Sequence, residues 1–198
     1  MQEIVTFALG YLLGSVPFGL VIVKMAGLGD VRSQGSGNIG ATNVLRTGRK
    51  DLALATLILD AGKGAFAVVA AGLLTHWAPW PMALAGAGAF LGHCFPVWLR
   101  FHGGKGVATY LGTAFAFDWR VGIMIAIIWL LAAATTRWSS AGALAAALCA
   151  PVLFLLLGGV AFAVAAAFMT ALVFYRHKGN IERIRNRTEP KIGQRKTT

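Results

Sequence analysis

The chain has 198 residues, of which 57% are hydrophobic and only 13% are charged, and its formal net charge is +11. This composition excludes an ordinary soluble domain, because such domains carry about 25% charged residues. Nucleic acid is not an expected partner, since no basic helix or aromatic platform accompanies the positive charge. The basic excess instead fits a lipid bilayer with anionic headgroups, together with an anionic substrate.

Seven apolar segments predict transmembrane helices, since a span needs roughly 20 apolar residues. In chain order they cover residues 4–23, 52–74, 82–99, 107–117, 121–136, 141–157 and 160–175. The fourth is short, about 16 Å long as a helix, and ends at a polar and aromatic turn, Phe117–Arg120, that suits an interface. Residues 176–198 form a basic tail, whose end from Asn186 is expected to trail at the membrane surface. The sequence therefore predicts an all-α, multi-pass membrane protein with a single domain.

The distribution of Lys and Arg predicts the orientation of these spans. The basic residues of the loops follow the first, third, fifth and seventh spans, whereas the other links contain only Arg120. Cytoplasmic loops carry the excess of Lys and Arg in membrane proteins. The N-terminus is therefore expected outside, in the periplasm, and the C-terminus in the cytoplasm. This topology brings three polar segments to the cytoplasmic face, where we expect the active site: Gly35–Arg46, Phe101–Thr109 and Arg176–Glu182.

The first polar segment is a glycine-rich loop with a high density of hydrogen-bond donors. Its Gly35-x-Gly-x-x-Gly40 spacing matches a dinucleotide fingerprint, but no strand precedes it and a membrane helix follows, so that fold is not expected. The donors are the side chains of Ser36, Asn38, Thr42 and Asn43 and the guanidinium of Arg46. Glycines let the backbone approach an oxyanion, which these donors could then hold. An interfacial turn is the alternative, but a turn needs fewer donors than this loop contains.

The second polar segment surrounds a lysine with glycines directly before a predicted helix. It reads His102-Gly-Gly-Lys-Gly-Val-Ala-Thr109 and lacks the spacing of a Walker A loop. Backbone amides, the start of a helix and the ammonium of Lys105 together suit a phosphate. The alternative is a lysine that only anchors the cytoplasmic side of the protein, but that role would not need three glycines.

Ionisable side chains also occur inside predicted spans and at the last helix end. Asp60 and Lys63 are three residues apart, so they lie on nearby faces of a helix. Two explanations for such ionisable residues within a span stay open: a direct role in function, or a buried contact that supports the site loops. His93 is expected to be a satisfied core histidine. His177 and Asn180 share the same helical spacing and can point together at a ligand.

Three motifs carry a resemblance to a known family. They are Ser36-Gly-Asn-Ile-Gly-Ala-Thr-Asn43, Gly92-His-Cys-Phe-Pro-Val97 with Gly103-Gly-Lys-Gly-Val-Ala-Thr109, and His177-x-x-Asn-Ile181. In combination the chain resembles the acyl-phosphate-dependent glycerol-3-phosphate acyltransferases of bacteria, the PlsY family. Asp60-x-x-Lys63-Gly64 and Thr188-Glu-Pro-Lys-Ile-Gly193 are also similar to the family's pattern.

The resemblance implies an activity and a mechanism. The chain would transfer a fatty acyl group from acyl phosphate to the 1-hydroxyl of sn-glycerol 3-phosphate, the first acylation of bacterial phospholipid synthesis, and release lysophosphatidic acid and inorganic phosphate. Because acyl phosphate is already activated, the protein mainly has to position the reactants and stabilise charge. We expect substrate-assisted catalysis without an acyl-enzyme, in which the leaving phosphate accepts the hydroxyl proton. No residue is assigned as catalytic, and His177 is the fallback base.

The resemblance also divides the polar residues between the two substrates. Those expected to bind glycerol 3-phosphate are Ser36, Arg46, Lys105, His177 and Asn180. Those expected to bind acyl phosphate are Gly37, Asn38, Thr42, Asn43, Gly103, Gly104, Gly106 and Thr109. The structural polar residues within the membrane are Asp60, Lys63 and His93. Neither a metal nor another cofactor is expected.

The remaining expectations concern location, assembly and the rival function. The resemblance implies a monomer in the bacterial inner membrane. The rival reading is a small membrane transporter for an organic or phosphorylated anion. A transporter would need polar residues that continue to the outer side, where the sequence offers little beyond His76, Asp118 and Arg120.

Overall fold

The computed structural model describes residues 1–33 and 37–192, and most of them are helical. The helices are α1 (Gln2–Gly14), α2 (Phe18–Met25), α3 (Ala41–Val44), α4 (Lys50–Leu74), α5 (Pro79–Cys94), α6 (Val107–Phe117), α7 (Trp119–Thr136), α8 (Ser139–Leu157), α9 (Val160–Arg176) and α10 (Lys178–Arg185). Short 3-10 helices cover Val31–Ser33, Leu45–Thr47 and Val97–Leu99. The described residues contain no strand, which confirms the all-α prediction.

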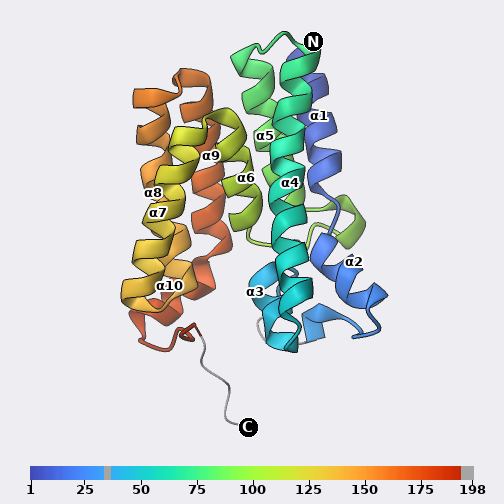
Figure 1. Cartoon of the computed structure of the whole chain (residues 1–198), viewed down its shortest axis with the longest axis vertical. Coiled ribbons are helices and arrows are strands. Elements are labelled where there is room, and N and C mark those ends of the chain that lie inside the picture. Colours follow the sequence, from blue (N-terminus) through green and yellow to red (C-terminus); the bar gives the residue numbers. More distant parts are fainter. Residues whose placement is uncertain (34–36, 193–198) are drawn as a thin grey trace.

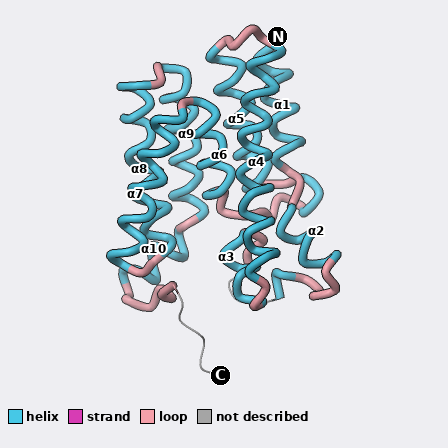
Figure 2. The backbone as a smooth tube through the Cα atoms, viewed as in Figure 1, coloured by secondary structure: helices cyan, strands magenta, loops and turns pink. Residues whose placement is uncertain are grey.

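The long helices form two groups that α6 joins (Figure 1). Helices α1, α4 and α5 pack together on one side, and α7, α8 and α9 pack together on the other. Between them, α6 packs on α4 and α7, and α5 packs directly on α9. At the end of the fold where the N-terminus lies, short turns connect the long helices (Figure 2). Helices α2, α3 and α10 lie at the opposite end of the fold.

Small residues let α1 and α5 approach each other closely. A Cβ added at Gly14 would lie 2.0 Å from the carbonyl oxygen of Ala89, and one added at Gly88 would lie 2.3 Å from that of Phe7. Backbone contact of this kind is what small residues permit between apolar helices. The abundance of Gly and Ala in the chain therefore serves helix packing.

The Gly88→Val variant is expected to lower the free energy of unfolding by about 1–3 kcal/mol, the usual cost of overpacking, because α1 must move away from α5. Thermal unfolding of the purified chain in detergent measures this loss. Gly62→Val is the matched control, since a Cβ added at Gly62 meets nothing within 4 Å. Equal melting temperatures for the two variants would contradict the prediction.

The first predicted span, residues 4–23, is not one continuous helix. Helix α1 ends at Gly14 and α2 begins at Phe18. Between them, Pro17 has no N–H for a helical hydrogen bond and disfavours helical geometry at Val16. The expectation of a single helix is therefore wrong here, although the stretch Gln2–Met25 remains long and apolar enough to cross a membrane.

The described helices support a multi-pass membrane protein. Five stretches are long and apolar enough to cross a bilayer, and a sixth is added if α9 and α10, which are bent by 59°, count as one span. Large apolar side chains such as Ile58, Leu130 and Leu156 are exposed on these helices, as expected for surfaces that face lipid. Helix α6, with 11 residues, is shorter than a usual span. The count of seven spans and their orientation stay predictions.

Candidate functional site

The three polar segments singled out in the sequence lie at one end of the fold, where the second and third are in direct contact. Hydrogen bonds connect Lys105 to Asn180, and connect Arg176 to the backbone of Gly103 and Gly104. Helix α3, which belongs to the first segment, lies at the same end as α10, away from the N-terminus (Figure 1). Residues far apart in the sequence can therefore contribute to one site.

Lys105 is half-buried, and its ammonium donates a hydrogen bond to the side-chain oxygen of Asn180. Burial lowers the pKa of Lys105 to about 8. The cations of Arg183, Arg176 and Arg46 act in the same direction. Several positive charges therefore converge on one partly buried point. An anion placed there would relieve their mutual repulsion, so the cluster is suited to bind a phosphate.

A buried carboxylate, Glu189, orients Asn180. The Asn180 amide nitrogen and the Ser140 hydroxyl each donate to Glu189 Oε1 at 2.6 Å, and Arg183 Nε donates to Oε2 at 2.7 Å. Burial raises the pKa of Glu189, but these three hydrogen bonds outweigh it and lower the pKa below its ordinary value. Because its nitrogen is bound to Glu189, Asn180 turns its oxygen toward Lys105.

The chain beyond Asn186 is held against the helices, which corrects one expectation from the sequence. Glu189 is 9% exposed, and the backbone N–H of Ile192 donates to the Arg137 carbonyl at 2.7 Å. A tail that trails at the membrane surface is therefore wrong for the described residues up to Ile192. Glu189 and its partner Ser140 received no role from the sequence. The available signal was the Thr188-Glu-Pro-Lys-Ile-Gly193 motif, which places a carboxylate in a strongly basic segment.

Arg176, the last residue of α9, binds the backbone of the glycine loop, residues 103–106. Its guanidinium donates to the carbonyl oxygens of Gly103 at 2.6 Å and Gly104 at 3.0 Å. The N–H groups of these glycines donate to the carbonyls of Cys94 and His93 at 3.2 and 3.0 Å. Both amides are thus engaged within the protein, and their expected contact with acyl phosphate stays a prediction.

Gly106 and Thr109 shape the start of α6. Gly106 has a φ of +80°, and a Cβ added there would lie 2.2 Å from the Phe90 ring. Only glycine fits this position without strain. Thr109 is fully buried, and its hydroxyl has no hydrogen-bond partner among the described residues. These two residues lie beside the site loop.

His177 lies between α9 and α10 and is neutral at pH 7. Burial lowers its pKa to about 4, and the charge of Lys105 acts in the same direction. Its Nδ1 lies 2.8 Å from the Val173 carbonyl oxygen. A carbonyl can only accept, so Nδ1 carries the proton and Nε2 is left as an acceptor. His177 is therefore suited to accept a hydrogen bond from a hydroxyl group.

Asn43 holds the first polar loop together. It is buried, and its amide nitrogen donates to the carbonyls of Val31 at 2.8 Å and Asn38 at 2.7 Å. Its side-chain oxygen accepts from Arg46 at 3.4 Å, and the side-chain oxygen of Asn38 accepts from the Gly40 N–H at 3.4 Å. These contacts shape the loop and direct Arg46.

The other residues predicted in this loop are more open. Gly37 and Thr42 are exposed, and Gly37 has a φ of +70°. Ser36, expected to bind glycerol 3-phosphate, lies outside the described residues.

The intramembrane polar residues form one buried cluster. Lys63 Nζ lies 2.8 Å from Asp60 Oδ1, and His93 Nδ1 lies 3.6 Å from the same oxygen. Each of the three side chains is at most 4% exposed. Lys63 also donates to the Val16 carbonyl at 2.8 Å, and its nitrogen lies 5.7 Å from the centre of the Phe18 ring.

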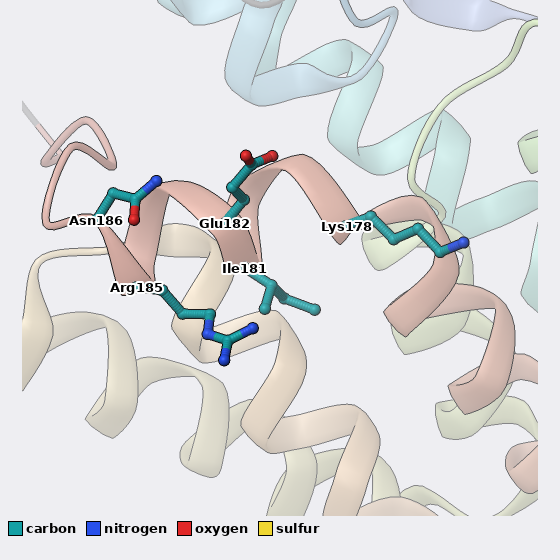
Figure 3. Close-up of a pocket in the computed structure, with 5 residues that line it drawn as sticks. All are labelled: Lys178, Ile181, Glu182, Arg185 and Asn186. Atoms are coloured by element: carbon teal, nitrogen blue, oxygen red, sulfur yellow. The ribbon is translucent and has the colours of Figure 1, made fainter.

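A surface pocket of about 460 Å³ lies along α10 but does not contain the residues of the site. Figure 3 shows its lining, which runs along the helix from Lys178 to Asn186. The lining residues recur every three or four positions, so they share one face of α10, whereas Asn180 projects from the other face. Among the described residues, no group of three His, Cys, Asp or Glu side chains could hold a metal ion.

Comparisons with known proteins show which family this chain resembles. The family described as glycerol-3-phosphate acyltransferase matches residues 4–187. A glycerol-3-phosphate acyltransferase from Mesorhizobium japonicum is 55% identical over 190 residues, and the match covers 96% of each chain. Two crystal structures of PlsY (YgiH), an integral membrane glycerol 3-phosphate acyltransferase, are 34% identical, with 98% of this chain and 96% of that chain covered. The TM-score is 0.91 for the glycerol 3-phosphate form and 0.89 for the lysophosphatidic acid form.

Proposed function

This chain belongs to the glycerol-3-phosphate acyltransferase family and acylates glycerol 3-phosphate to lysophosphatidic acid, and we propose how its residues perform that reaction. The observation that supports this proposal is the partly buried Lys105, which is hydrogen-bonded to Asn180 and lies near the positive charges of Arg46, Arg176 and Arg183. In our proposal Lys105, Arg46 and Asn180 bind the phosphate end of glycerol 3-phosphate. Ser36 belongs to the same set on the strength of its motif.

The proposed acyl donor is acyl phosphate. Its phosphate would lie near the first polar loop and the start of α6, where Gly37, Asn38, Thr42, Asn43 and Thr109 are found, together with Gly103, Gly104 and Gly106. Two anionic headgroups at one site fit the excess of positive charge there. The acyl chain would extend between the apolar helices.

In the proposed reaction the 1-hydroxyl oxygen of glycerol 3-phosphate attacks the acyl carbonyl carbon. The bond between that carbon and the phosphate oxygen breaks, and the leaving phosphate carries away the hydroxyl proton. No covalent acyl-enzyme forms. The neutral His177 accepts a hydrogen bond through Nε2 from a hydroxyl of the glycerol other than the attacking one, and so holds the substrate in place.

The His177→Ala variant is expected to raise KM for glycerol 3-phosphate by about tenfold while kcat changes by less, because a binding contact is lost and the proton acceptor is retained. Steady-state kinetics at saturating acyl phosphate measure both constants. A collapse of kcat with KM unchanged would instead identify His177 as the general base.

A direct assay tests the proposed donor. Purified chain in detergent receives acyl phosphate and labelled glycerol 3-phosphate, without acyl carrier protein or coenzyme A. Labelled lysophosphatidic acid is the expected product, and acyl-coenzyme A in place of acyl phosphate should give none. No product from acyl phosphate would contradict the proposal. Uptake of labelled glycerol 3-phosphate into proteoliposomes without acylation would favour the transporter.

The proposed setting is the inner membrane of a bacterium, with seven spans that include the short α6. The N-terminus lies in the periplasm, and the site loops face the cytoplasm. The excess of Lys and Arg in those loops supports this orientation. Labelling of single cysteines placed at residues 76 and 187 in intact cells tests it, since only position 76 should react with an impermeant reagent.

A further inference from the structure

The buried Asp60–Lys63–His93 cluster is connected to both loops that carry the proposed site, to the first through helix α2 and to the second by direct contact. Lys63 reaches the first of them through the break between α1 and α2. Its ammonium donates to the Val16 carbonyl at 2.8 Å, directly before Pro17. The same carbonyl accepts the Phe18 N–H at 3.1 Å, so the buried lysine is its second donor. This contact ties Lys63 to the segment directly before α2.

Helix α2 in turn supports the loop that contains Arg46. A Cβ added at Gly19 of α2 would lie 2.0 Å from the Ile39 carbonyl oxygen, so the helix and the loop are in backbone contact. Val23 of α2 packs in a fully buried cluster with Val31 and Val44 of the loop region. A shift of α2 would therefore move the backbone on both sides of the first polar loop.

His93 connects the same cluster to the second loop. Its carbonyl accepts the Gly104 N–H at 3.0 Å, and a Cβ added at Gly104 would lie 2.1 Å from His93 Nε2. The imidazole therefore packs directly on the backbone that precedes Lys105. Its other nitrogen, Nδ1, lies 3.6 Å from Asp60, which the ion pair with Lys63 holds in place.

We infer that the Asp60–Lys63–His93 cluster is a positioning element that sets the Gly103–Lys105 loop and the α1–α2 break relative to each other, and thereby the spacing of the two walls of the glycerol 3-phosphate site. This inference rests on the proposed function. The three side chains are almost completely buried and lie against one another, and Lys63 is bound to Asp60 and to the backbone, which favours positioning over contact with substrate. His93 Nδ1 has no hydrogen-bond partner among the described residues, so the expectation of a satisfied core histidine is wrong for this atom.

The test separates positioning from stability by comparing single and double variants. Lys63→Met leaves the Asp60 carboxylate buried without its cation, so its melting temperature falls. The double variant Asp60→Asn with Lys63→Met removes both charges, and its melting temperature should return toward that of the wild type. The contact with the Val16 carbonyl stays lost, so KM for glycerol 3-phosphate should remain raised by about tenfold or more, as expected for misplaced binding groups.

Phe154→Leu is the control for lost stability alone. Phe154 is fully buried in α8 and packs on Phe117 and Phe162, away from the site loops. This variant should melt earlier with KM for glycerol 3-phosphate unchanged. A double variant with wild-type KM would overturn the inference and leave the proposed function standing. An inactive wild-type chain would contradict the proposed function, and the inference with it.

The link between His93 and Gly104 has its own test. Gly104→Ala alone forces the imidazole aside and should raise KM for glycerol 3-phosphate by about tenfold. In a His93→Ala background the added methyl group has room, so the same substitution should change KM by less than about threefold. Full additivity of the two substitutions would overturn the connection through His93.

Discussion

The Lys105→Met variant is expected to lose about two to three orders of magnitude in kcat/KM for glycerol 3-phosphate, the usual result of truncating a partly buried charge that binds an oppositely charged group. Lys105 is the lysine at which the cations of Arg46, Arg176 and Arg183 converge, and it is bound to Asn180. Methionine keeps the length of the side chain but removes its charge and its donors. Kinetics over a wide range of glycerol 3-phosphate concentrations measure the loss.

Two further variants show whether the position of the charge matters. Lys50→Met removes an exposed lysine at the start of α4 and should leave kcat/KM close to the wild-type value. Lys105→Arg keeps the charge on a larger group and should recover part of the activity. Activity of Lys105→Met within threefold of the wild type, or equal losses for Lys50→Met, would contradict the assignment.

The same lysine predicts a pH dependence. With a pKa of about 8, Lys105 is charged below that pH and loses its proton as the pH rises through it. The phosphate of glycerol 3-phosphate is already a dianion there, since its second pKa is about 6. In the free enzyme kcat/KM should therefore fall by about tenfold per pH unit above 8. Lys105→Arg should remove this fall, and a flat wild-type profile to pH 10 would contradict it.

Much of the helical architecture was predictable because a bilayer demands long apolar segments. From residue 107 onward the predicted spans agree with α6 to α9 within two residues at each end. The helix break at Pro17 could also have been predicted from the proline, but the residues on both sides are apolar, so the hydropathy pattern indicated one continuous span. Hydropathy reports where a chain is apolar, whereas the continuity of a helix depends on single residues.

The site was predictable in its residue types and less so in their contacts. Lys105 and Asn180 were both expected to bind glycerol 3-phosphate, and the structure places them in direct contact although 75 positions separate them. The glycines before Lys105 were expected to offer their amides, but two of those amides are bound by the carbonyls of His93 and Cys94. The backbone amides that a loop leaves free for a ligand depend on its tertiary contacts, and the spacing of residues in a sequence motif does not reveal those contacts.

The residues behind the site were the least predictable. Arg176 was given no role of its own within the third polar segment, yet its guanidinium holds the Gly103–Lys105 loop. Ser140, at the start of α8, gave no sequence signal, because a hydroxyl at a helix start is common. Its role appears only once Glu189 folds back onto it from 49 positions away.

The Glu189→Gln variant is expected to lower kcat/KM for glycerol 3-phosphate by about tenfold, because it disturbs the orientation of Asn180. The carboxylate accepts hydrogen bonds from Ser140, Asn180 and Arg183 through two oxygens. Glutamine offers one oxygen and one NH₂ group, so at least one donor faces another donor. If Asn180 rotates in response, its own NH₂ group turns toward Lys105.

Glutamine also removes a negative charge that raises the pKa of Lys105. The fall of kcat/KM with pH should therefore begin below pH 8 in Glu189→Gln, a shift that lost stability alone would not produce. Glu182→Gln is the matched control, because Glu182 is exposed and lines the pocket on the other face of α10. It should keep the wild-type profile. In the Lys105→Met background Glu189→Gln should cost little more, since both act through the same contact. An unshifted pH profile together with fully additive losses would show that Glu189 does not act through Lys105.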